Sequence, residues 1–353
     1  MKILIKGIAA IFAVALIILL IVPLGHPNIL APLTLAFPFV VIANAIMLIL
    51  LLLFRCFKSS ILMAVLLAVS FPAARRSIVM HPSVNEPSDG AKELTILTYN
   101  IEIFKSYKNV EPILALIRQE TPDIICMQEF GHYYNNRPAV NNILASLDSI
   151  YPYRHLWYKN QTAGNESGLV LFSKYPIVNK QKLEYESKNN ISVFSDIVIG
   201  DDTIRIINNH LESNRLTLTE REITDNPTDT SRMKSIYHKM VVSAHIRADQ
   251  ADSIAALIEN TRYPVLVVGD FNDIPQSYTY RRILYSENKL GESLHDAYAD
   301  AGELGMYHTY NQNHLDVAID HILYTKPIRA IKTTILKVDY SDHYPLLSRL
   351  VIE

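Results

Sequence analysis

The stretch Pro264-Val265-Leu266-Val267-Val268-Gly269-Asp270-Phe271-Asn272 decides the fold of the C-terminal part of this chain. Its first five residues are apolar and mostly β-branched, so they predict a buried strand. The strand ends in a carboxylate and a carboxamide two residues apart. Because side chains i and i+2 of a strand point the same way, we expect Asp270 and Asn272 to project together from the strand end.

A second motif, Ser341-Asp342-His343, lies just before the last predicted strand, Leu346–Ile352. It places a carboxylate beside an imidazole. A site that hydrolyses phosphate esters needs carboxylates for a divalent metal, a donor for a phosphoryl oxygen and a His held by an acid. The two motifs together contain these parts.

Polar residues also end or interrupt other apolar segments, where a core strand has no packing use for them. Asn100 and Glu102 follow the predicted strand 94–99, and Gln128-Glu129 ends the strand 123–128. Asn209-His210 ends the strand 203–208, and Asp320 lies in the late strand 318–323. The many strands, with helices expected over 110–119 and 240–257, indicate two sheets packed face to face with helices outside. The polar stretch 212–235 has no clear period and is interpreted as a long surface insertion.

Taken in this order, the motifs closely resemble the endonuclease/exonuclease/phosphatase superfamily, whose fold is that of pancreatic deoxyribonuclease. The matching stretches are Thr98–Glu102, Met127–Glu129, Gly168–Pro176, Asn209–Leu211, Gly269–Asn272, Ile319–Leu323 and Ser341–His343. The resemblance covers about residues 94–352. It implies a four-layer α/β sandwich with two central mixed β-sheets and a site at one edge of the sheets.

The resemblance also implies a role for each matching residue. Glu129 matches the principal metal ligand, with Asn100, Glu102 and Asp342 completing the metal and phosphate shell. Asp270 and Asn272 match the pair that contacts the attacking water and the phosphate. His343 matches the catalytic His and Asp320 the acid that orients it, while His210 matches a His near the leaving group. The residues leave the general base open between His343 and Asp270. The oxygen-rich shell favours Mg²⁺ or Mn²⁺ over Zn²⁺.

Residues 1–76 form a different region, with no Asp or Glu and only six Lys and Arg. Apolar runs over 3–24 and 33–54 are long enough to span a membrane, which needs about 20 residues. A third run, 60–75, is short and either spans or lies in the interface. We interpret 77–93 as a linker and 94–353 as the soluble domain.

Basic residues in short loops predict the orientation. Lys2 and Lys6 precede the first run, and Arg55 and Lys58 precede the third. If these residues are cytoplasmic and the third run spans, the soluble domain lies on the non-cytoplasmic side of an inner or plasma membrane. Arg75 and Arg76 depart from the rule, because they would then lie outside.

Charge separates the candidate functions. Residues 77–353 hold 27 basic and 35 acidic residues, a net charge of −8. A protein that grips duplex DNA usually carries a basic surface, so this balance argues against a general nuclease. The leading hypothesis is a membrane-anchored, metal-dependent phosphoesterase, and a phosphodiesterase is favoured over a phosphomonoesterase. Its expected partners are the lipid bilayer, through the N-terminal helices, and a phosphate-ester substrate. The alternatives are a nuclease of the same superfamily and a catalytically silent membrane-bound scaffold. Nothing in the sequence requires a protein partner.

Overall fold

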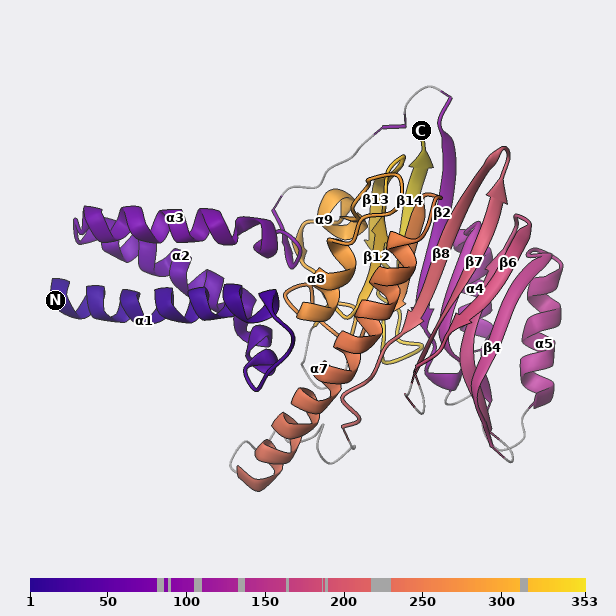
Figure 1. Ribbon diagram of the computed structural model, residues 1–353, viewed down its shortest axis with the longest axis horizontal. Helices are drawn as coiled ribbons and strands as arrows, with labels where there is room; N and C mark the ends of the chain where they lie inside the picture. Colours follow the sequence, from indigo (N-terminus) through magenta and orange to yellow (C-terminus); the bar gives the residue numbers. More distant parts are fainter. Residues whose placement is uncertain are drawn as a thin grey trace.

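The computed structural model describes residues 1–353 except 81–85, 88–89, 105–109, 133–136, 163–164, 186, 188–189, 217–229 and 312–316. Figure 1 shows a bundle formed by the N-terminal helices α1, α2 and α3 beside a layered domain, with the N-terminus at the far end of the bundle. The bundle region contains α1 (Lys2–Ile21), η1 (Val22–Leu24), η2 (Ala31–Ala36), α2 (Phe37–Leu53) and α3 (Phe57–Ala74).

Three segments of this region are long and apolar enough to cross a membrane by length and composition: Lys2–Leu24, Ala31–Leu53 and Phe57–Ala74. They suggest membrane anchoring. Asn44 of α2 is buried, and its Nδ2 donates to the carbonyl of Phe12 in α1 at 3.1 Å. A buried amide between apolar helices fixes how they pack, because lipid offers it no partner.

The part of the domain that the structure describes forms two six-stranded sheets and one short two-stranded sheet. The first has the order β13 (Ile328–Ile335), β14 (Leu346–Ile352), β2 (Lys92–Asn100), β3 (Ile124–His132), β5 (Asn165–Ser173) and β4 (Tyr153–Thr162). The second has the order β10 (His295–Asp296), β12 (Asp320–Tyr324), β9 (Val265–Asp270), β8 (Asp202–His210), β7 (Ile191–Ile199) and β6 (Ile177–Leu183). The short sheet pairs β1 (Ile78–Val79) with β11 (Gly305–Met306).

Both large sheets are mixed, because β2–β3 and β8–β9 are parallel and the other pairs are antiparallel. Within the described residues, the helices of the domain are η3 (Glu102–Phe104), α4 (Val110–Glu120), α5 (Arg137–Asp148), α7 (Thr230–Glu259), α8 (Tyr278–Leu284) and α9 (Ala297–Ala301).

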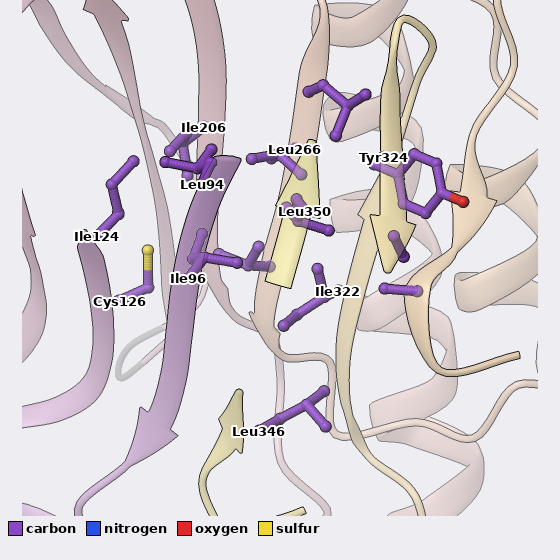
Figure 2. Packing of buried hydrophobic residues seen from close by; sticks show 14 of the residues in the cluster. Leu94, Ile96, Ile124, Cys126, Ile206, Leu266, Ile322, Tyr324, Leu346 and Leu350 are labelled. Atoms are coloured by element: carbon purple, nitrogen blue, oxygen red, sulfur yellow. The ribbon is translucent and has the colours of Figure 1, made fainter. Parts of the chain in front are cut away.

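Period-two alternation along the strands divides the core between the sheets and their outer faces. Leu94 and Ile96 of β2 pack between the sheets against Leu266 of β9 and Ile322 of β12, as Figure 2 shows. The alternate residues of the same sheet pack outward against α4 and α5, and α7 and α8 cover the outer face of the second sheet. The expected four-layer α/β sandwich is confirmed.

Topology places the polar ends of the strands together. The parallel strands β8 and β9 end side by side, with His210 opposite Asp270. Because β12 runs antiparallel to β9, its first residue, Asp320, faces Asp270. The sequence pattern placed Asp320 within a strand over 318–323, whereas Asp320 is the first residue of β12.

Two segment assignments need correction. Residues 230–235, interpreted as part of a loop, form the first turns of α7, and 217–229 lie outside the described residues. These turns are exposed and lack apolar periodicity of their own, which explains why the sequence pattern missed them. The linker 77–93 includes β1 and the first two residues of β2, because Ile78 and Val79 pair with β11.

Candidate active site

Asp270 lies at the centre of the site. It is the last residue of β9 and is buried. Gly269, at φ 118°, permits this position, since a Cβ there would meet the carbonyl oxygen of Asn209 at 2.2 Å. The Asp270 Oδ1 accepts the backbone N–H of Asn272 at 2.8 Å, and Oδ2 accepts from the Asn272 Nδ2 at 3.2 Å.

Asp270 and Asn272 therefore project together, but strand alternation is not the cause. The strand has already ended, and Asn272 has a left-handed φ of 51°. Its Nδ2 also donates to the carbonyl of Leu211 at 3.0 Å. A turn closed by hydrogen bonds brings the two side chains together, which is a local structure that Asn and Asp favour.

Asn100 connects the two sheets across the site. It ends β2, and its Nδ2 donates to the Asp270 Oδ2 at 3.0 Å. Its Oδ1 accepts the backbone N–H of Glu102 at 3.1 Å. Glu102 and Ile103 both have positive φ, 47° and 52°. Two successive non-glycine residues in this region are costly, and such backbone is concentrated at functional sites.

Glu129 projects from a β-bulge. The sequence pattern placed it at the end of its strand, but β3 continues to His132, and the pairing with β5 shifts between Met127 and Phe130. Glu129 has φ 52° within this irregularity. Bulges next to active sites re-aim side chains, as this one does. The Glu129 Oε1 lies 3.7 Å from the His210 Nε2, and that nitrogen lies 3.7 Å from the Asp270 Oδ2.

His343 is held by Asp320. The His343 Nδ1 lies 2.8 Å from the Asp320 Oδ2, and both side chains are buried. The other ring nitrogen, Nε2, lies 3.8 Å from the Asp270 Oδ2 and 4.0 Å from the Asp342 Oδ1. The imidazole thus has one nitrogen bound to an acid while the other faces the remaining carboxylates.

The electrostatics follow from burial among charges. Burial opposes the charged form of His343, but the carboxylates of Asp320 and Asp270 outweigh it and raise its pKa to about 10. Burial raises the pKa of Asp270 to about 6, against the opposing effect of the two imidazoles. Burial lowers the pKa of His210. Two histidines that both face Asp270 therefore favour opposite protonation states.

The carboxylates at Glu129 fit a hard divalent cation. Burial, and next the charge of Asp342, raise the pKa of Glu129 to about 7, and Glu102 adds to this effect. Ionisation of Glu129 is unfavourable because other carboxylates surround it, and a bound cation would stabilise its charged form. Glu129, Asp342 and Asn100 supply the oxygen donors that Mg²⁺ or Mn²⁺ prefers.

A second cluster, Asp270, Asp320 and His343, offers ligand atoms within 4.8 Å of one another. Asp320 already binds Nδ1 of His343 at 2.8 Å. A metal on that imidazole would place a cation against a nitrogen whose protonation these acids favour. The oxygen donors near Glu129 are therefore the better metal site.

Of the nine residues predicted for the site, seven line one cavity of about 430 Å³. The seven are Asn100, Glu129, His210, Asp270, Asn272, Asp342 and His343. Glu102 and Asp320 are not among the lining residues, but each is hydrogen-bonded to one of them, Asn100 and His343.

Supporting residues were missed by sequence reasoning. Thr309 accepts the backbone N–H of Asp320 at 3.0 Å through Oγ1, and the Tyr307 hydroxyl donates to the Asp320 carbonyl. Ser341 donates from Oγ to the Asn100 carbonyl at 2.7 Å. Thr309 and Tyr307 follow no strand motif, whereas Ser341 precedes Asp342-His343 and that adjacency was a usable signal.

Arg247 and Gln250 of α7 are both buried. Arg247 Nε pairs with the Asp273 carboxylate at 3.0 Å and Gln250 Oε1 accepts the Glu212 N–H at 2.9 Å. They fix the segments that follow β8 and β9. His321 is buried between the aromatic rings of Phe271 and Tyr280, and its Nε2 lies 2.9 Å from the Asp273 carbonyl oxygen. These contacts give it a structural role.

The four-layer sandwich and the cluster of carboxylates and histidines in its cavity define a hydrolase of phosphate esters with a deoxyribonuclease-like fold. A family model described as Endonuclease/Exonuclease/phosphatase family matches residues 97–343, and the chain belongs to this family. No curated protein matches the sequence.

Similar solved structures agree in fold. Humanized D. rerio TDP2 has a TM-score of 0.53 at 13% identity, over 73% of this chain and 98% of that one. A family protein from Leptotrichia buccalis C-1013-b has 0.52 at 15% identity, over 73% and 99%. Sphingomyelinase C from Streptomyces griseocarneus has 0.50 at 15% identity, over 74% and 100%.

Proposed function

We propose that this protein is a membrane-anchored, divalent-metal-dependent phosphodiesterase that cleaves its substrate by attack of water. The observation that carries the proposal is the array in which the Asp320–His343 pair, Asp270 and Glu129 meet at one cavity. Family membership makes the chain a phosphoester hydrolase, and the array supports the metal requirement and the acid–base roles.

The proposed metal ligands are Glu129 and Asp342, with Asn100 and Glu102 supporting them. These residues would hold a divalent cation, which would supply positive charge to neutralise the charge that develops on the phosphoryl oxygens in the transition state. Asn272 is suited to orient the phosphate from the turn that follows β9.

We assign to Asp270 the role of general base, which accepts a proton from the attacking water. Its carboxylate is held from three sides, by Asn100, by Asn272 and by the N–H of Asn272, so it is pre-positioned to accept. His343 has Nδ1 bound to Asp320, which stabilises its charged form, and its Nε2 is then a donor to the phosphoryl oxygen. His210, on the opposite side of Asp270, is placed to hydrogen-bond the leaving group.

We further propose that the domain lies on the non-cytoplasmic side. The three apolar helices and the basic residues Lys2, Lys6, Arg55 and Lys58 support this orientation. Arg75 and Arg76 depart from the charge rule for this orientation, but both side chains make contacts with the domain. Arg75 pairs with Asp300 at 2.5 Å, and Arg76 donates to the Tyr285 hydroxyl at 3.1 Å.

A side-by-side assay tests the function. The full-length protein is purified in detergent and given bis-p-nitrophenyl phosphate, p-nitrophenyl phosphate, plasmid DNA and phospholipid vesicles, each with Mg²⁺, Mn²⁺ or EDTA. We expect hydrolysis of the diester to need the metal and to exceed that of the monoester. Full activity in EDTA contradicts the metal requirement, and inactivity on every substrate favours the silent scaffold.

A further inference from the structure

The cavity at the active site has two chemically different ends. One end carries the polar residues described above. The other is apolar and is lined by Val22, Pro23, Leu35, Met233, Ile236 and Met240. A pocket with a few convergent polar groups at one end and an apolar remainder fits an amphiphilic ligand.

The apolar end is built by two elements that no phosphate chemistry requires. One is the connector between α1 and α2, residues 22–36, which contains no Asp, Glu, Lys or Arg. The other is the N-terminal half of α7. The Tyr237 hydroxyl of α7 donates to the carbonyl of Ile29, and η2 packs on α7 while η1 packs on α8. The membrane region thus supplies one wall of the catalytic cavity.

The position of this wall matters because it consists of the ends of two candidate spans, Lys2–Leu24 and Ala31–Leu53, and the loop between them. Three spans place the connector 22–36 and the end of α3 on the same side of the bilayer. The domain is bound at that same side, where Gln276 bridges Ser77 at 3.0 Å and the carbonyl of Ala73 at 2.9 Å. In Figure 1 the bundle meets the domain at α8 and α9, close to α7. The apolar end of the cavity therefore lies where the chain leaves the membrane.

The charges around the cavity do not favour a long polyanion. Among the described residues, its lining includes two Arg, and both are paired: Arg215 with Glu212 at 2.5 Å and Arg247 with Asp273 at 3.0 Å. A nucleic acid groove instead tracks the backbone with cations that are available to phosphates.

We propose that the substrate is a phosphoester with an acyl or alkyl chain that enters from the bilayer. Its phosphate lies among Asp270, His343 and Glu129, and its chain lies between the connector 22–36 and α7. This inference rests on the proposed function and adds the substrate class to it.

The test uses the full-length protein in detergent and a series of p-nitrophenyl alkyl phosphodiesters from ethyl to octyl, each below its micelle-forming concentration. We expect kcat/KM to rise along the series, by up to about four-fold per buried methylene, the factor that corresponds to about 0.8 kcal/mol. The variant Ile236→Ser should lower the octyl-to-ethyl ratio of kcat/KM by about five- to ten-fold, and Ile236→Leu should restore it.

Val242→Ser is the matched control. Val242 lies on the same helix, is exposed and does not line the cavity, so its substitution should leave the ratio unchanged. Substrates partition into detergent equally for every variant. The difference between Ile236→Ser and Val242→Ser in the octyl-to-ethyl ratio therefore measures the contribution of the cavity wall alone.

The outcomes separate the inference from the function on which it rests. A flat series with metal-dependent hydrolysis of the ethyl diester overturns the lipid substrate and leaves the phosphodiesterase intact. An equal drop in the ratio for Ile236→Ser and Val242→Ser also overturns it, as does plasmid DNA cleaved with a higher kcat/KM than the octyl diester. Absence of metal-dependent hydrolysis on every diester removes both.

Discussion

Replacing Asp320 by Asn should disable His343 while leaving its position unchanged. The amide oxygen can still accept the hydrogen bond that now spans 2.8 Å, but it carries no charge. The pKa of His343 stands at about 10 against an ordinary 6.5, and this rise corresponds to about 5 kcal/mol at about 1.4 kcal/mol per pH unit. Asp320 is the largest favourable contribution to it.

If Asp320 supplies half of that rise, its loss removes roughly 2–3 kcal/mol of stabilisation from the imidazolium, which is on the order of 50-fold in rate. We therefore expect Asp320→Asn to lower kcat/KM by roughly 50-fold or more, and His343→Ala to lower it by roughly 10²–10⁴-fold, the range for a positioned acid or base.

The assay is hydrolysis of bis-p-nitrophenyl phosphate at saturating Mg²⁺ by Asp320→Asn, His343→Ala and the double variant. If the two residues act as one unit, the double variant should be no worse than about three-fold below His343→Ala. Asp196→Asn is the control, since Asp196 is a buried carboxylate paired with Arg205 at 2.7 Å on β7, outside the site. It should reduce thermal stability without a comparable loss of kcat/KM. Losses that simply multiply, or a fully active His343→Ala protein with the wild-type fold, would refute the reasoning.

Three further predictions concern the other residues of the domain. Glu129→Gln should raise the Mg²⁺ concentration for half-maximal activity by about ten-fold or more, because a metal-binding charge is lost; a metal titration with unchanged half-activation excludes Glu129 as a ligand. His210→Ala should reduce cleavage of an alkyl leaving group by roughly ten-fold more than that of p-nitrophenolate, which needs little assistance; equal losses on both, with lowered stability, point to a structural role instead. Burial lowers the pKa of His155 to about 4, so the unfolded chain binds its proton first and stability should fall as pH drops from about 6.5 to 4, by about 2–3 kcal/mol. The fluorescence of Trp157, the one Trp of the chain, reports denaturant unfolding at each pH, and a His155→Gln protein that loses as much stability as the wild type over this range would contradict the assignment.

The sequence by itself determined the fold class and the composition of the site. The apolar strands along the chain, such as 94–99, and the apolar segments of the first 76 residues are local patterns, and local patterns can be read from one dimension. The list of polar residues at strand ends was readable because each interrupts an apolar run for no packing reason.

Only the tertiary structure decided how those residues reach one another. Glu129 is aimed by a bulge and Asn272 by a left-handed turn, and neither conformation has a period that a sequence pattern can carry. Asp320 reaches Asp270 because β12 runs antiparallel to β9, a pairing between segments about 50 residues apart in the chain.

The wall of the cavity formed by residues 22–36 was equally beyond the sequence. The sequence assigned 22–24 and 33–36 to the two apolar runs and 25–32 to the loop between them, and it predicted no contact between this region and the helix that became α7. In the structure η2 packs against α7, and the Tyr237 hydroxyl of α7 donates to the carbonyl of Ile29. Whether either segment is buried depends on the surface of the other, which lies far away in the sequence. Neither segment alone therefore predicts the wall of the cavity.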